Sequence, residues 1–268
     1  MDRRTFMSAA AAIAASQLPM GTTAEAQPAS GPAPTSSSGE PKFRIAMIIF
    51  DGMTNQDFVG PNDIFARCKQ AEIDVLAKTM DPVKTDARGR ILPDKALRDA
   101  ADHYDMLFIG GGGGATAMME DAEVIAFLQS RAAKAKYITS VCTGALVLGS
   151  AGLLRGYKAA THWAAMGVLP LLGAIPTKQR VVVDRNRITG GGVTAGIDFG
   201  LTVVAELWGA EQAQTIQLGM EYDPHPPFDA GSPDKAPAAI LAKSKDGLAR
   251  MTGLRMDAAH RIEARWKS

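Results

Sequence analysis

The amino-acid sequence predicts a layered α/β fold with a mostly parallel central sheet. Short apolar segments of strand composition alternate along the chain with longer segments of helical composition. Several of the apolar segments are near-continuous, which is typical of strands that are buried on both faces. Polar or glycine-rich turns follow these strands directly. Because the active site of such a sheet lies beyond the carboxyl ends of its strands, these turns are where chemistry is expected.

The elements can be assigned in chain order between residues 43 and 220. Apolar and β-branched runs predict strands at 43–50, 73–77, 105–109 and 137–141. Helical composition predicts helices at 60–70, 123–133, 142–150, 197–208 and 210–220. Pro61 is expected near the first position of the first helix, where proline is tolerated. Two short runs around the turn 184–186 predict a late hairpin with strands at 181–183 and 187–189.

Length and composition are those of an ordinary globular protein. The chain has 268 residues, of which 46% are hydrophobic and 21% charged. These values exclude a disordered chain, a collagen-like repeat and a disulfide scaffold, and the range 42–230 is long enough for one catalytic domain. A net charge of +1 gives no overall case for binding nucleic acid. Two cysteines are too few to hold the fold together, so each is considered as an individual thiol.

The segment 1–26 has the pattern of a twin-arginine signal peptide. Arg3 and Arg4 precede a short Ala-rich run, and Ala24 and Ala26 flank a small-x-small cleavage site. The apolar run is too short to span a membrane. The Pro/Ser/Gly-rich stretch 27–41 has the composition of a linker, and the alternative for the leader is an Ala-rich helix of the mature fold. We therefore expect a periplasmic or otherwise exported protein with no membrane segment in its mature form.

The segment 231–268 is a basic tail. It holds eight basic and four acidic residues, a net charge of +4, whereas the range 27–230 carries −3. Such an asymmetry favours a solvated helix with a basic face, and the alternative is an arm for nucleic acid or anionic lipid. The tail is too short for the pair of helix-turn-helix units that a transcriptional regulator needs. We expect no nucleic-acid partner.

Cys142 is the main candidate for catalysis. It follows the expected strand 137–141 and begins the next helix without a spacer. A sharp strand-to-helix turn lifts such a side chain out of the sheet, as in a nucleophile elbow, and Gly144 lets the helix pack closely. A helix N-terminus also favours the thiolate over the thiol. The alternatives are an inert core cysteine and a disulfide with Cys68.

The glycine loop (110–114) follows the third expected strand. It lacks the Lys-Ser/Thr pair of a P-loop, so the sequence does not favour phosphate binding. Bare N–H groups at a strand end, such as those of Gly111 and Gly112, can form half of an oxyanion hole facing Cys142. The alternative is a plain turn.

Asp57 and His162 are supporting candidates. Asp57 lies just before the expected helix 60–70, where it serves either as a helix cap or as a general acid/base beside the thiol. His162 is either a partner of Cys142 or an ordinary polar residue. None of the four histidines has metal-ligand spacing with the cysteines, so no metal is expected.

Five ordered motifs within about residues 42–225 resemble those of the PfpI superfamily, which is similar to the class I glutamine amidotransferases. They are Asp57 before Gly60-Pro61, the glycine loop, the segment 140–145, the segment 160–163 and the segment 187–198. The combination of Asp57 with Cys142-Thr143 looks most like the isonitrile hydratase branch. Gly110 stands where the family usually has proline, and the leader and the tail beyond Asp229 are atypical of the family.

The resemblance implies a flavodoxin-like three-layer fold, a homodimer, and no metal or organic cofactor. It implies hydration of a small-molecule isonitrile to an N-substituted formamide, with Cys142 as nucleophile, Asp57 as proton carrier and Thr143 orienting the adduct. One alternative is another cysteine-dependent enzyme on this scaffold, either a hydrolase or a glyoxal-processing enzyme. The other is a non-enzymatic redox or ligand sensor.

Overall fold

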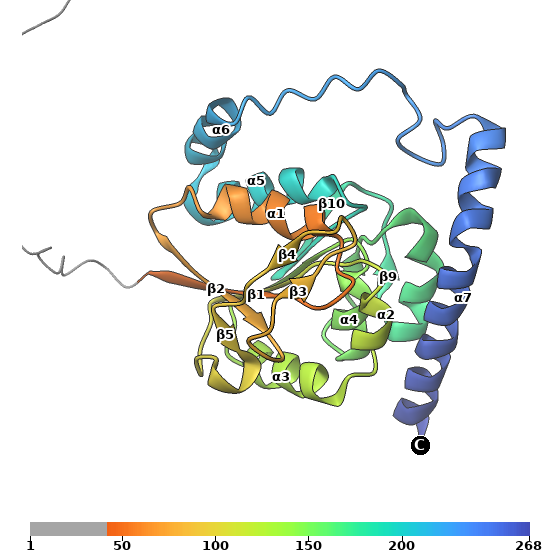
Figure 1. Cartoon of the computed structure of the whole chain (residues 1–268), viewed down its shortest axis with the longest axis horizontal. Helices are drawn as coiled ribbons and strands as arrows, with labels where there is room; N and C mark the ends of the chain where they lie inside the picture. Colours follow the sequence, from red (N-terminus) through yellow and green to blue (C-terminus); the bar gives the residue numbers. More distant parts are fainter. Residues whose placement is uncertain (1–41) are drawn as a thin grey trace, which may run out of the picture. The chain divides into compact units, whose positions relative to one another are not determined.

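A seven-stranded sheet forms the centre of the computed structural model, which describes residues 42–268 (Figure 1). Its order is β10-β11-β7-β6-β1-β2-β5, and every neighbouring pair is parallel except β10 with β11. The strands are β1 (Phe43–Ile48), β2 (Ala71–Ala77), β5 (Lys95–Ala96), β6 (Met106–Ile109), β7 (Tyr137–Val141), β10 (Val181–Asp184) and β11 (Arg187–Gly190). Two small two-stranded sheets pair β3 (Val83–Lys84) with β4 (Arg90–Ile91) and β8 (Lys158–Ala159) with β9 (Ile175–Pro176).

Helices cover both faces of the large sheet, with α1 and α5 on one side and α3 and α4 on the other (Figure 1). The helices are α1 (Asn55–Phe65), η1 (Leu97–Asp99), α2 (Ala115–Met118), α3 (Ala122–Ala132), α4 (Gly144–Ser150), η2 (Trp163–Leu172), α5 (Ala195–Trp208), α6 (Ala210–Gly219) and α7 (Ala238–Lys267). This arrangement confirms the predicted flavodoxin-like, three-layer α/β class. The predicted signal peptide (1–26) and linker (27–41) lie outside the described residues.

Burial of the sheet on both faces explains why the sequences of its strands are almost continuously apolar. All four residues of β6 are buried, because helices cover both of its faces. Phe199 of α5 meets Phe65 of α1 edge-on, with ring centroids 6.2 Å apart, and meets Phe108 of β6 at 5.6 Å. These contacts fix α1 and α5 against the sheet, so the carboxyl end of β1 and the start of α1 are held near the neighbouring strand ends.

The first helix corrects one prediction. It begins at Asn55 rather than at residue 60, and Pro61 lies inside it. The helix can start early because Asp86 caps it from outside: the Asn55 N–H donates to Asp86 Oδ1 at 3.0 Å, and the Thr54 hydroxyl donates to Oδ2 at 2.8 Å. Asp57 therefore lies in the first turn of α1. A cap supplied from 31 positions away leaves no signal in the local sequence.

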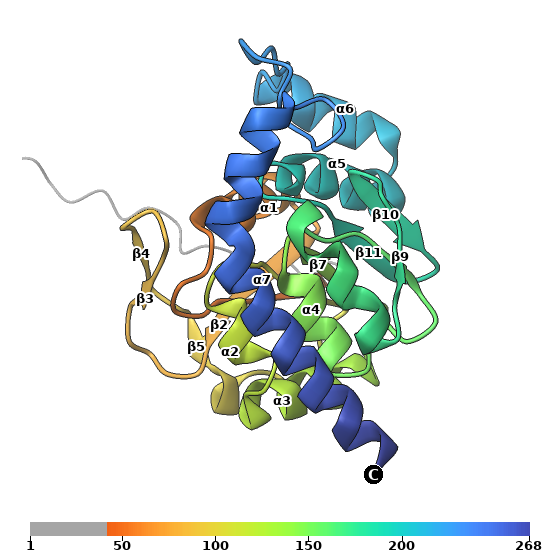
Figure 2. The ribbon, with the colours of Figure 1, turned by 90° about the vertical axis from the view of Figure 1, so that its right-hand side faces the viewer.

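Helix α7 occupies most of the basic tail and packs against η2 and α2 (Figure 2). Ala258, Ala259 and Ile262 bury one of its faces. Further along, Arg261 and Arg265 both bind Glu120. At the helix end Trp266 lies under the guanidinium of Arg155, which is 3.7 Å from the ring centroid. The tail helix is thus docked on the domain rather than solvated all round. None of the helices within residues 42–268 has the length and apolarity to cross a membrane.

Candidate active site

Cys142 lies at a sharp turn between β7 and α4. Its backbone φ is 56°, in the left-handed region that few non-glycine residues adopt. The turn is held on both sides, because the Cys142 N–H donates to Gly191 O at 2.7 Å and Thr161 Oγ1 donates to the Cys142 carbonyl at 2.8 Å. A Cβ on Gly144 would lie 2.2 Å from Ile109 O, so only glycine lets α4 begin so close to β6. The geometry is that of a nucleophile elbow.

The two cysteines are both free and buried. Cys68 follows the end of α1, where its thiol contacts Ile64 O at 3.7 Å. The disulfide that the sequence left open is therefore absent from the structure, and Cys142 has a free thiol.

Asp57 is fully buried beside the thiol. Its Oδ2 accepts a hydrogen bond from the Gly111 N–H at 2.7 Å. Its Oδ1 has no hydrogen-bond partner within residues 42–268. Its interaction with the neighbouring Cys142 thiol lowers the pKa of the acid and raises that of the thiol. Residues 85 positions apart in sequence thus form one proton-sharing pair.

The pKa values of this pair decide where its protons reside. Burial raises the pKa of Asp57 to about 7, against the opposing effect of the Gly111 hydrogen bond. Burial, and then the charge of Asp57, raise the pKa of Cys142 to about 12, although the backbone N–H groups of Thr143 and Val193 hydrogen-bond to its sulfur. Near neutral pH the sulfur is therefore protonated, which corrects the expectation that the helix N-terminus would favour the thiolate. The carboxyl group is poised to accept or donate a proton.

The glycine loop corrects the oxyanion prediction for Gly111 and Gly112. The N–H of Gly111 is engaged by Asp57 Oδ2, and that of Gly112 by Thr143 Oγ1 at 3.0 Å. Neither N–H is free for a developing anion, so both residues position catalytic side chains instead. A Cβ on Gly111 would lie 2.4 Å from Thr143 N, which explains why the loop has no side chain there. A Cβ on Gly110, the position where proline was expected, would lie 3.0 Å from that of Asp57.

Thr143 and His162 have more limited contacts than expected. The buried Thr143 hydroxyl is bound to the glycine loop, so its side chain positions that loop. The half-buried His162 caps η2, with Nδ1 accepting the Ala164 N–H at 3.3 Å. Burial and then the charge of Arg255 lower the pKa of His162, which favours its neutral form. Within the described chain His162 makes no hydrogen bond to Cys142.

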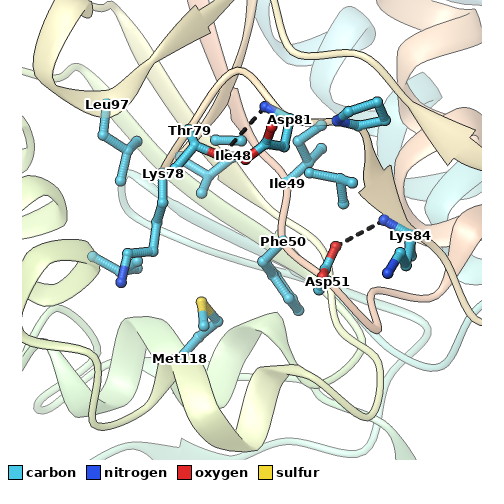
Figure 3. Close-up of a pocket in the computed structure, with 14 residues that line it drawn as sticks. Ile48, Ile49, Phe50, Asp51, Lys78, Thr79, Asp81, Lys84, Leu97 and Met118 are labelled. Carbon is cyan, nitrogen blue, oxygen red and sulfur yellow. Dashed lines mark hydrogen bonds between the residues drawn. The ribbon is translucent and has the colours of Figure 1, made fainter.

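Two cavities lie near the strand ends. One of about 310 Å³ borders the elbow, with Thr161, Gly191 and Gly192 in its wall; Trp163 and Met166 are among its apolar residues, and Lys178 and Arg180 also line it. Another of about 480 Å³ lies at the ends of β1 and β2, between residues such as Ile48, Phe50 and Met118 (Figure 3). Neither cavity is lined by a predicted site residue, but Thr161 and Gly191 in the wall of the first both hydrogen-bond to the Cys142 backbone, so the first is the better candidate for holding a substrate substituent. Residues 42–268 contain no cluster of three or more His, Cys, Asp or Glu arranged for a metal ion.

A comparison with family models matches residues 43–206, more than half of the chain, to the model described as the DJ-1/PfpI family. The chain belongs to this family. A curated relative, the isonitrile hydratase of Pseudomonas putida, is 43% identical over 223 residues, which are 83% of this chain and 97% of the relative. This alignment is longer than the range 42–225, which contains all the motifs that resemble the family.

Two further members of the DJ-1/PfpI family are informative. A crystal structure of a THiJ/PfpI family protein from Pseudomonas syringae has a TM-score of 0.80 and 46% identity, and covers 87% of this chain and 97% of that chain. The glutathione-independent glyoxalase DJR-1.2 of Caenorhabditis elegans is 26% identical over 51% of this chain and 73% of its own length. Curated relatives of this chain are thus named for different activities, and the site residues have to discriminate between them.

One site residue of this DJ-1/PfpI chain was missed by sequence reasoning. Arg255 of α7 is only 6% exposed, and its Nη2 donates to Gly112 O at 3.1 Å. It lies on the buried face of the helix together with Ala258, Ala259 and Ile262, at the spacing i, i+3, i+4 and i+7. An arginine on the apolar stripe of an amphipathic helix is the signal that identifies it. Counting the charges of the tail concealed that signal.

Proposed function

We propose that the protein is an isonitrile hydratase, which adds water to an isonitrile to give an N-substituted formamide. The observation that carries the proposal is the buried Cys142–Asp57 pair at the elbow, in a chain that aligns with nearly the whole length of an isonitrile hydratase. The reaction needs a nucleophile for the terminal carbon and a group that moves one proton onto that carbon. The pair provides both.

In the first half of the reaction the sulfur adds to the isonitrile. The Asp57 carboxylate takes the thiol proton while Cys142 Sγ forms a bond to the terminal carbon. Asp57 then donates the same proton to that carbon, which leaves a thioimidate, Cys–S–CH=N–R, and a carboxylate. Covalent catalysis of this kind divides a slow hydration into two easier steps. The carboxyl pKa of about 7 suits a group that must accept and return a proton.

In the second half water adds to the thioimidate. The water oxygen bonds to the carbon, while Asp57 accepts a water proton and passes it to the nitrogen. The tetrahedral adduct then collapses: its hydroxyl proton moves through Asp57 to the departing sulfur, the C–S bond breaks, and the formamide leaves. The enzyme returns to its starting protonation state, and one water has been added to one isonitrile. Thr143 and Gly111 contribute by holding the glycine loop and Asp57 in place.

Substrate profiling tests this proposal against the glyoxal-processing alternative. We expect the purified protein to convert cyclohexyl isonitrile to N-cyclohexylformamide, and to convert methylglyoxal at least about 100-fold less efficiently, as measured by kcat/KM. Trp163 and Met166 give the cavity that borders the elbow an apolar wall for the substituent. If methylglyoxal is consumed and no formamide appears, the protein is a different cysteine enzyme of the family. If neither substrate is turned over while peroxide oxidises Cys142, the sensor alternative is favoured.

Export through the twin-arginine pathway is also proposed, on the sequence of segment 1–26. Replacing both arginines (Arg3→Lys and Arg4→Lys) is expected to leave the precursor in the cytoplasm, because the export machinery requires the arginine pair. Cell fractionation with a C-terminal epitope provides the measurement. Unchanged secretion of the doubly substituted protein contradicts the assignment. The homodimer stays a prediction, for which sedimentation of the purified protein is the test.

A further inference from the structure

Arg255 carries a buried positive charge with no acidic partner. Within residues 42–268 no carboxylate lies within 4.0 Å of its guanidinium, although Arg261 and Arg265 on the same helix both reach Glu120. The side chain makes one hydrogen bond in this part of the chain, from Nη2 to Gly112 O. Its buried Nε has no hydrogen-bond partner there. Buried arginines normally bind a carboxylate, because an unpaired buried charge costs several kcal/mol.

The guanidinium lies against the glycine loop, next to the elbow. Gly112, whose carbonyl accepts its hydrogen bond, also donates to Thr143, the residue after Cys142. The charge of Arg255 acts on His162, and the charge of ionised Cys142 acts on Arg255. His162 in turn packs against Gly192, in the wall of the cavity that borders the elbow. An anion bound by Arg255 would therefore lie beside the glycine loop, within electrostatic reach of the thiol.

We propose that Arg255 binds a carboxylate carried on the substituent of the substrate, so that the enzyme prefers isonitriles with an anionic group near the reacting carbon. This inference rests on the proposed hydratase function. Arginine suits the task, because its planar fork of N–H donors matches the two oxygens of a carboxylate. Arg255 would then be a specificity-determining residue that the tail helix adds to the elbow of the domain.

Alkylation of Cys142 tests the anion site without requiring turnover. Iodoacetate and iodoacetamide react with the same sulfur and differ in carrying a carboxylate or a neutral amide. We expect their rate ratio at Cys142, divided by the ratio for N-acetylcysteine, to exceed one. The ratio should fall about tenfold or more in Arg255→Met, since a charge-assisted hydrogen bond is lost, and should be partly retained in Arg255→Lys. Peptide mass spectrometry separates modification of Cys142 from that of Cys68.

Matched controls separate anion binding from other roles of the arginine. Arg250→Met removes an exposed arginine from the same helix and should leave the ratio unchanged. If Arg255→Met slows both reagents equally, the residue acts only on the thiolate, and the carboxylate site is refuted. Equal ratios in wild type and variant refute it as well.

A measurement on the wild-type protein covers the case in which Arg255→Met does not fold. N-formylglycine, an anionic formamide, should protect Cys142 from iodoacetamide at concentrations where its neutral amide does not. Equal protection by the two compounds contradicts the proposal. Turnover provides an independent check: isocyanoacetate should have a KM lower than its methyl ester by about tenfold or more. A protein that shows anion-selective alkylation but hydrates no isonitrile would refute the proposed function while leaving the anion site in place.

Discussion

We expect Cys142→Ala to reduce the hydration rate of cyclohexyl isonitrile by at least about 10³-fold, because the variant has no atom that can form the thioimidate. The fold should persist, since alanine is smaller than cysteine and meets the same left-handed backbone, with a φ of 56°. Formamide production followed by liquid chromatography and mass spectrometry measures the loss. Near-UV circular dichroism verifies that the packing around the elbow is intact.

Cys68→Ala is the matched control for this substitution. Cys68 is also buried and also free, and its thiol contacts the Ile64 carbonyl near the end of α1. Its removal should leave kcat unchanged and cost stability alone. Hydration that survives in Cys142→Ala, or that disappears in Cys68→Ala, contradicts the assignment of the nucleophile. Mass spectrometry of wild type quenched during turnover should additionally show the thioimidate adduct on the peptide that contains Cys142.

Asp57→Asn should lower kcat/KM by about 10²–10⁴-fold, the usual contribution of a positioned general acid/base. An amide retains the shape of the carboxyl group but cannot carry the proton from sulfur to carbon. Because the reaction begins with a carboxylate facing a thiol, wild-type kcat/KM should rise with pH through about 7, as Asp57 ionises, and remain high until the thiol titrates near 12. Asparagine should abolish the rise near pH 7. A wild-type pH profile that is flat through this range contradicts the proton-transfer role.

Asp57→Asn, which should lower activity, should raise the stability of the folded protein above pH 7. The pKa of Asp57 is raised in the folded state, from 3.8 to about 7, so the folded protein binds the proton more tightly than the unfolded chain does. The free energy of unfolding therefore falls as pH rises from about 4 to 7, by at most about 4 kcal/mol from this group. Above pH 7 Asp57→Asn should be more stable than wild type, and near pH 4 the difference should be small. Chemical denaturation at the two pH values measures the difference, and equal stabilities at both would show that the ionised carboxylate is better solvated than its burial indicates.

Features that depend on residues adjacent in the sequence could be predicted from the sequence. The elbow at Cys142 was predicted because a strand, a cysteine and a small-residue helix follow one another directly. The meeting of Asp57 with Cys142 could be expected only in outline, because the carboxyl ends of parallel strands gather at one edge of a sheet. The start of α1 was misplaced because its cap, Asp86, is distant in sequence. The engaged N–H groups of Gly111 and Gly112 were missed because hydrogen-bond partners follow from the folded geometry.

Arg255 illustrates a different limit. The tail was assessed by its net charge, and a sum of charges treats every arginine alike. Arg255 differs from the other arginines in its position on the apolar face of α7. That face becomes buried only when the helix docks on the domain. Helices η2 and α2 supply that surface, and Glu120 and Arg155 bind side chains near the end of α7. Helical periodicity alone would have marked the residue for attention, without indicating which part of the domain it reaches.

The docking of α7 has a consequence for when the protein becomes competent during its synthesis. The ribosome releases the elbow, the glycine loop and Asp57 early, and the sheet that holds them can assemble while translation continues. Arg255 emerges only after these parts, so a nascent chain can possess its reactive thiol before its last cationic group arrives. A chain arrested between α6 and α7 should then display Cys142 without the guanidinium beside it. Cys142 is therefore synthesised before Arg255, the residue that we propose selects the substrate.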